Sequence, residues 1–287
     1  MPVRRGWLGV FVAFAALCTA GCERALFAFV NRAVAPPEAS VVYGQGLSLD
    51  VYRPVAGTSP APVVVFFHGG EWKRGTRAEY RFVGRRLAGE GMVAIVADYR
   101  TYPRTTFPGF VEDGAAAVAW AIANAARYGG DGKRVFVAGH SAGAQIAALI
   151  GTDARYLRAH GLAPRDLAGV IGLSGPYDFR VGPAFRPVFA GRGDDAQAVR
   201  FVDGDEPPFL LVHGARDAVV ESVDSELLAQ RLREARVPVR VVMLADGTHT
   251  TPLAGLYEPA RAPCVLRAID AFVLGQPGEA TRGAVAP

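Results

Sequence analysis

Short apolar runs alternate along this chain with longer stretches whose composition suits helices. The runs predict strands at Leu49–Tyr52, Val63–Phe67, Met92–Ala97, Val135–Ala138, Val170–Leu173, Phe209–Val212 and Val239–Leu244. Several runs are continuous and β-branched, which is typical of strands that helices cover on both faces. The intervening stretches predict helices near Arg77–Gly89, Phe110–Tyr128, Ala142–Gly151, Ser222–Ala235 and Pro259–Leu274. This alternation predicts an α/β fold with a mostly parallel, doubly wound sheet and helices on both faces.

The N-terminus of the 287-residue chain has the pattern of an export signal. Two arginines precede an apolar run over residues 7–17, which is too short to span a bilayer comfortably, and small residues follow it. We therefore expect residues 1–21 to be a signal peptide. The ending Thr-Ala-Gly-Cys resembles a bacterial lipobox, in which the cysteine, here Cys22, is lipidated. Plain secretion and an uncleaved N-terminal anchor are the alternatives.

The rest of the chain divides by composition. We expect a tether over residues 22–40, an α/β domain over 41–275 and a disordered tail over 276–287. Residues 175–208 are rich in glycine, proline and charge, and predict a short cap over a site. If Cys22 is lipidated, the domain is anchored at a bacterial cell envelope. Otherwise it is periplasmic.

The charge pattern argues against nucleic-acid binding. The net charge is +4, but the 31 basic residues are scattered among 27 acidic ones, and no basic block interleaves with aromatic residues. The sequence also has no CxxC, no HExxH and no glycine-rich loop with phosphate-binding spacing. We therefore expect neither a metal nor a cofactor.

A single serine stands where a predicted strand meets a predicted helix, in the stretch KRVFVAGHSAGAQIAALIG. A G-x-S-x-G motif in this context is typical of a nucleophile elbow, a sharp turn that lifts the serine clear of the sheet. Gly139 and Gly143 leave room for that turn, and the helix that starts at Ala142 presents free N–H groups nearby. Ser141 is the predicted nucleophile, with His140 beside it as a packing or hydrogen-bonding residue.

A nucleophile of this kind requires an acid and then a histidine after later strands. The stretch PFLLVHGARD places Asp217 just after one strand, and VRVVMLADGTH places His249 after the next. The carboxylate would orient the imidazole, which takes the serine proton. Asp224 and Asp246 are alternative acids. His68 and His213 occupy strand ends with expected turn roles.

The stretch VVVFFHGGEW provides a candidate oxyanion loop after an early strand. Glycine lets backbone N–H groups turn towards a substrate carbonyl without a Cβ in the way. We expect the amides of Gly70, Glu71 and Ala142 to be the donors, supported by His68, Gly69 and Trp72. Trp72 is predicted to pack and hold the loop, and the Glu71 carboxylate to face elsewhere.

Together, HGGEW, GHSAG, HGARD and DGTHT resemble the esterase/lipase branch of the α/β-hydrolase superfamily. That branch is related to hormone-sensitive lipase, bacterial feruloyl and acetyl-xylan esterases, prenylcysteine methylesterases and kynurenine formamidases. The stretches DVYRP, ADYRTYP, YGGDGKRV and LSGPYD also resemble it. The resemblance implies an α/β-hydrolase fold and a serine carboxylesterase that hydrolyses small or medium esters through an acyl-enzyme.

Two other functions are compatible with the sequence. One is an arylformamidase-like amide hydrolase, which would use the same triad with a different pocket. The other is a catalytically silent envelope-binding lipoprotein on the hydrolase scaffold, since one fold hosts many functions. The expected partner of the enzyme is a small-molecule ester. The natural substrate and the oligomeric state do not follow from the sequence.

Overall fold

The structure is a computed structural model that describes residues 25–54 and 60–275. Its strands are β1 (Ala39–Tyr43), β2 (Leu47–Tyr52), β3 (Ala61–Phe67), β4 (Val93–Ala97), β5 (Gly130–His140), β6 (Gly169–Leu173), β7 (Phe209–Gly214) and β8 (Val239–Leu244). Its helices are α2 (Arg81–Gly89), α3 (Gly109–Asn124), α4 (Ala142–Thr152), α5 (Ala154–Arg158), α6 (Arg186–Phe189), α7 (Val223–Glu234), α8 (Thr251–Tyr257) and α9 (Pro263–Leu274). The predicted signal peptide, Cys22 and the predicted tail lie outside the described residues.

Within the described residues the strands form one sheet in the order β1-β2-β4-β3-β5-β6-β7-β8. The pairs from β4 through β3 to β8 are all parallel, whereas β1 and β2 add to one edge in antiparallel fashion. The predicted mostly parallel sheet is therefore confirmed. Because parallel strands end at the same edge, the loops that follow β3, β5, β7 and β8 come together there.

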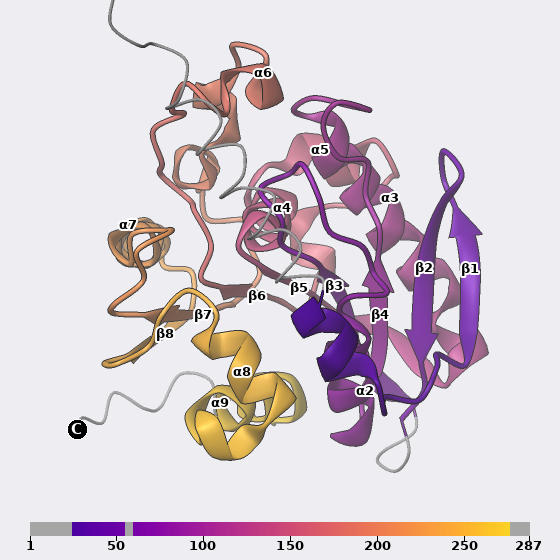
Figure 1. The fold of residues 1–287 in the computed structure, drawn as a ribbon. Helices are drawn as coiled ribbons and strands as arrows, with labels where there is room; N and C mark the ends of the chain where they lie inside the picture. Colours follow the sequence, from indigo (N-terminus) through magenta and orange to yellow (C-terminus); the bar gives the residue numbers. More distant parts are fainter. Residues whose placement is uncertain (1–24, 55–59, 276–287) are drawn as a thin grey trace, which may run out of the picture.

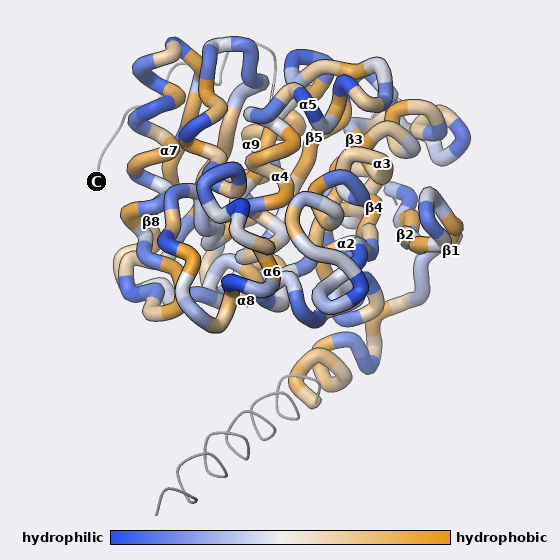
Figure 2. The backbone as a smooth tube through the Cα atoms, turned by 90° about the horizontal axis from the view of Figure 1, so that it is seen from above, coloured by the Kyte–Doolittle hydropathy of each residue, from blue (hydrophilic) through white to orange (hydrophobic). Residues whose placement is uncertain are grey.

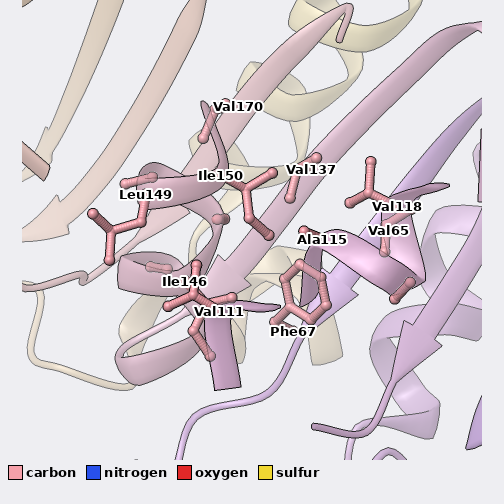
Figure 3. Close-up of a cluster of buried hydrophobic side chains, with 14 of the residues drawn as sticks. Val65, Phe67, Val111, Ala115, Val118, Val137, Ile146, Leu149, Ile150 and Val170 are labelled. Atoms are coloured by element: carbon pink, nitrogen blue, oxygen red, sulfur yellow. The ribbon is translucent and has the colours of Figure 1, made fainter. Parts of the chain in front are cut away.

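Helices cover both faces of the sheet (Figure 1). All seven residues of β3 are buried, and alternate ones face opposite layers. Val65 and Phe67 pack on the side of α3 and α4, where side chains such as Val111 and Ile146 fill the core (Figure 3). Val64 and Phe66 face the other layer, which contains apolar residues of α2, α8 and α9. Burial on both faces explains why these strands lack polar alternation.

The sheet begins slightly earlier than the boundary expected at residue 41. β1 starts at Ala39 and pairs with β2, although Val42 in this strand is 68% exposed. The edge position of β1 explains why it carries no strong apolar signal, because only part of it faces the core.

The described part of the predicted tether packs on the domain instead of standing apart from it. Residues 25–31 are helical, and the Phe27 ring lies 5.1 Å from the Tyr80 ring. Asn31 donates to the carbonyl oxygen of Glu79 at 2.7 Å and accepts from the amide of Phe82 at 3.0 Å. This segment projects at the rim of the molecule (Figure 2). None of the helices in the described ranges has the length and apolar character needed to cross a membrane.

The helix predicted from Arg77 starts four residues later, at Arg81. The Arg77 amide donates to the Asp98 carboxylate at 2.7 Å, and its guanidinium bonds Asp50 at 2.9 Å. These tertiary contacts hold residue 77 in a turn before the helix.

Candidate active site

Ser141 occupies the sharp turn between β5 and α4, as an elbow requires. Its backbone has φ 55° and ψ −120°, a positive φ that is strained for a residue with a Cβ. The Ser141 amide donates to the carbonyl oxygen of Leu173 at the end of β6, at 2.9 Å. Its carbonyl oxygen accepts from the amides of Ala144 and Gln145. The turn is therefore fixed both to the neighbouring strand and to the helix that follows.

The elbow has no space for side chains at its two glycines. A Cβ on Gly139 would overlap the carbonyl of Gly143, and a Cβ on Gly143 would overlap the carbonyl oxygen of Phe67 in β3. The helix thus approaches the sheet closely enough for backbone to touch backbone. This contact is the structural reason for glycine at both ends of the G-x-S-x-G motif.

The predicted acid and base meet beyond β7 and β8. His249 Nδ1 lies 2.7 Å from Asp217 Oδ2, and the Asp217 side chain is fully buried. Asp217 Oδ1 accepts from the amides of Val219 and Val220 at 2.8 and 2.9 Å. Burial by itself would raise the pKa of Asp217, but the hydrogen bonds from Val220, His249 and Val219 outweigh it and lower that pKa. The carboxylate therefore stays charged beside the imidazole.

The alternative acids lie elsewhere. Asp224 accepts from the amide of Asp178, and burial together with Asp178 and Glu221 raises its pKa to about 6. Asp246 is largely exposed and pairs with Arg216 at 2.6 Å. Neither carboxylate bonds to His249.

His249 is held against the elbow by the residue next to the nucleophile. His140 Nε2 lies 3.0 Å from the carbonyl oxygen of His249, and the two rings are 4.8 Å apart. In the described residues no hydrogen bond joins Ser141 Oγ to His249. Catalytic hydrogen bonds of this kind often tighten only when substrate binds.

The loop after β3 has the backbone conformation expected of an oxyanion loop. Gly70, Glu71 and Trp72 have φ values of 122°, 57° and 56°. A Cβ on Gly70 would overlap the carbonyl oxygen of Arg74. Within the described ranges, the amides of Gly70, Glu71 and Ala142 donate no hydrogen bond. All three predicted donors are thus available, and the Glu71 carboxylate pairs with Arg74 at 3.0 Å, away from them.

Two tyrosine hydroxyls and an indole N–H fix this loop by hydrogen bonds. The Gly69 amide donates to the Tyr80 hydroxyl at 3.1 Å, and the Tyr99 hydroxyl donates to the carbonyl oxygen of His68 at 2.9 Å. Trp72 is buried and donates from Nε1 to Gln145 in α4 at 3.1 Å. The loop and the elbow helix are therefore fixed to each other.

Comparisons with known proteins show similarity to esterases in sequence and in fold. The BD-FAE family model matches residues 49–184. Esterase LipC of Mycobacterium tuberculosis (strain ATCC 25618 / H37Rv) is 34% identical over 218 residues, covering 67% of this chain and 54% of LipC. The apo form of Thermogutta terrifontis esterase 2 superposes with a TM-score of 0.74 at 25% identity, over 88% of this chain and 97% of that one. The chain belongs to the esterase/lipase branch of the α/β-hydrolase superfamily.

A probable isoprenylcysteine alpha-carbonyl methylesterase, ICMEL1 of Arabidopsis thaliana, is similar over a longer range. It is 28% identical over 272 residues, covering 84% of this chain and 56% of the plant protein. The chain thus spans little more than half the length of LipC and ICMEL1. The BD-FAE match ends before Asp217 and His249, so the assignment of these two residues depends on chain order and on their contact.

Two buried histidines contact the predicted triad in ways that the sequence did not indicate. His140 bonds the backbone of His249, and His213 bonds the Asp217 carboxylate. Burial and the neighbouring His249 lower the pKa of His140 to about 3, and burial also lowers the pKa of His213. Both imidazoles are therefore neutral near pH 7. Their positions beside motif residues were visible in the sequence, but their partners were not.

The depressed pKa of His140 predicts an acid-sensitive fold. The unfolded chain binds a proton at this histidine below about pH 6.5, whereas the folded chain does not until about pH 3. The stability that this difference contributes is complete above pH 6.5 and is lost progressively as the pH falls towards 3. His140→Gln keeps an amide donor for His249 but cannot titrate. Between pH 7.5 and pH 5, the parent should lose about 2 kcal/mol more stability than the variant in urea unfolding.

The pKa values of His68 and His213 are also lowered, so these histidines destabilise the fold at low pH as well. Their contribution is the same in parent and variant, so the difference between the two proteins measures the effect of His140. His160→Gln, which removes an exposed imidazole, is the control for loss of a histidine. Parallel stability curves for the parent and His140→Gln would contradict the prediction.

Proposed function

We propose that this hydrolase is a serine carboxylesterase that cleaves small or medium carboxylic esters through an acyl-enzyme on Ser141. The observation that carries the proposal is the 2.7 Å contact between His249 Nδ1 and a fully buried, charged Asp217. The backbone of His249 also bonds His140, the residue next to Ser141 in the elbow. The contact with Asp217 favours the tautomer with hydrogen on Nδ1. His249 Nε2 is then left as the base for a serine hydroxyl.

The mechanism follows from these positions. Ser141 Oγ attacks the ester carbonyl carbon while its proton passes to His249 Nε2, and Asp217 stabilises the resulting imidazolium. The carbonyl oxygen becomes an oxyanion that accepts from the amides of Gly70, Glu71 and Ala142. Each such donor is worth about 3 kcal/mol in the transition state.

The tetrahedral intermediate then collapses. The bond from the carbonyl carbon to the alcohol oxygen breaks, and His249 returns its proton to that oxygen. Water repeats the sequence on the acyl-enzyme: His249 takes a proton from the water, and Ser141 leaves with it. The products are a carboxylic acid and an alcohol, and no oxidant or further reactant is needed.

The cap supports a substrate of modest size. Phe179 stacks on Trp72 at 5.6 Å, and Lys73 bonds the carbonyl oxygen of Ala184 at 3.0 Å. Gln145 joins Trp72 to the carbonyl oxygen of Ala196. The cap therefore rests directly on the oxyanion loop, which favours small or medium acyl groups.

Active-site labelling tests the proposal. A fluorophosphonate should attach covalently to the parent protein, and peptide mapping should find the adduct on Ser141. Turnover of p-nitrophenyl acetate and butyrate, compared with N-formylkynurenine, separates the esterase from the arylformamidase-like alternative. A folded parent that is unlabelled and hydrolyses none of these substrates would overturn the proposal and favour the silent binding scaffold.

The N-terminal sequence supports a second proposal, attachment to the cell envelope through a lipid on Cys22. We expect full-length protein expressed in a bacterium to sediment with membranes. Cys22→Ser should move it to the soluble fraction, because a lipid chain cannot attach without the thiol. Unchanged fractionation of the variant would contradict the lipid anchor.

A further inference from the structure

His213 is the second-last residue of β7, and its side chain is fully buried against the proposed triad. Its Nε2 is 3.1 Å from Asp217 Oδ2 and 3.1 Å from the carbonyl oxygen of Val220. Its Nδ1 is 2.8 Å from the hydroxyl of Ser225, which is itself fully buried in the first turn of α7. Every ring nitrogen of His213 therefore has a partner, and one partner is the carboxylate that orients His249.

The partners determine which nitrogen of His213 carries the hydrogen. The two atoms near Nε2 are a carboxylate oxygen and a carbonyl oxygen, which only accept, so the hydrogen is on Nε2. Nδ1 is then an acceptor, and the Ser225 hydroxyl donates to it. Asp217 and Val220 thus select the tautomer, because the opposite one would place a lone pair against a carboxylate and a carbonyl oxygen. The Ser225 hydroxyl then donates to Nδ1 and fixes the ring orientation.

We propose that His213, oriented by Ser225, is a positioning residue that fixes the Asp217 carboxylate for its hydrogen bond to His249. The proposal rests on the proposed function. Asp217 Oδ2 receives hydrogen bonds from both histidines, and Oδ1 receives the amides of Val219 and Val220. Among the described residues, only the donor from His213 fixes the position of Oδ2 independently of His249.

The consequence concerns the direction of the His249 ring. Without His213 Nε2–H, the carboxylate keeps its two amide donors on Oδ1 but can swing Oδ2 away from His249. The imidazole would then lose its fixed orientation towards Ser141. Because the side chains of His213 and Ser225 are fully buried, substrate binding should be nearly unaffected and the chemical steps should slow.

A matched pair of amides tests this role. In His213→Gln, the side-chain nitrogen reaches about as far as Nε2 and keeps a donor for Asp217. In His213→Asn, the shorter side chain reaches only the position of Nδ1, near Ser225. We expect kcat for p-nitrophenyl butyrate to fall roughly ten- to one-hundredfold in the asparagine variant, with KM within about twofold of the parent. The glutamine variant should stay within about threefold of the parent.

Proton NMR gives a second measure, which packing alone would not change. The His249 Nδ1–H, hydrogen-bonded to a charged carboxylate, should give a far-downfield resonance in the parent and in His213→Gln. In His213→Asn this resonance should broaden or disappear. Melting temperatures of the two variants, measured alongside, show how much each change affects the fold.

Ser225→Ala keeps the test decisive if a substitution at His213 prevents folding. It removes the hydroxyl that bonds His213 Nδ1 and should lower kcat roughly three- to tenfold without changing KM, because the ring loses the hydrogen bond that orients it. Equal kcat in the glutamine and asparagine variants, or losses that follow melting temperature alone, would overturn the positioning role. A parent whose hydrolysis does not depend on Ser141 would instead overturn the proposed function, so the two failures are distinguishable.

Discussion

Replacing Ser141 with alanine is expected to lower kcat for p-nitrophenyl butyrate roughly ten-thousandfold to a millionfold. Alanine fits the elbow but has no Oγ to attack the carbonyl, so the acyl-enzyme cannot form. The proposed oxyanion donors Gly70, Glu71 and Ala142 would remain in place, and the residual rate above that of water should reflect them alone. The measurement is the steady-state rate of purified protein, together with loss of fluorophosphonate labelling.

Ser174 provides a closely matched control. It follows β6, adjacent to β5 in the sheet, and its φ of 50° is close to that of Ser141. Its hydroxyl is buried and has no hydrogen-bond partner in the described part of the chain. Ser174→Ala should therefore keep parental activity and labelling. Similar losses at both serines would show that disturbance of a strand end, and not loss of a nucleophile, explains the result.

Replacing Gly143 with alanine should have the largest effect on stability. An alanine normally stabilises a helix interior by up to about 1 kcal/mol relative to glycine. Here the new Cβ would overlap the Phe67 carbonyl oxygen and lie 2.5 Å from the His68 carbonyl oxygen. Both are backbone atoms at the end of β3, which is paired on both sides and cannot move without disrupting the sheet. We expect a loss of at least about 3 kcal/mol, or no soluble protein.

Gly89→Ala is the matched control for this change. Gly89 ends α2, and no heavy atom lies within 4 Å of the Cβ it would gain. Urea unfolding should show the Gly89 variant at least as stable as the parent. If Gly143→Ala proves equally stable, then the close approach of α4 to β3 does not exist in solution as the structure shows it.

The sequence predicted the parallel strands and the chain order of the triad because both depend on local patterns. Continuous β-branched runs reveal buried strands, and a serine between glycines reveals an elbow. β1 was missed because Val42 on this edge strand faces outward, which weakens the pattern. The start of α2 was placed early because the carboxylates that hold Arg77 in a turn are distant in sequence: Asp50 lies in β2 and Asp98 directly follows β4.

The partners of the histidines could not be predicted for a similar reason. The sequence shows that His213 precedes Asp217 by four positions, but not that His213 and His249 both bond to Oδ2 of Asp217. That arrangement depends on β7 and β8 being neighbours and on α7 returning Ser225 to the end of β7. The positive φ values of Glu71 and Trp72 could not be predicted either, because a sequence indicates a positive φ mainly where it has glycine.

Phe27 connects the N-terminal segment to the proposed oxyanion loop, some forty residues later in the chain. Its ring packs on Tyr80, and the Tyr80 hydroxyl receives the amide of Gly69, which precedes the oxyanion donors. A shortened version that starts at residue 41, the boundary suggested by the sequence, would lose both this ring and the first two residues of β1. The helix over residues 25–31 thus supports the proposed oxyanion loop, and a recombinant protein should begin before this helix.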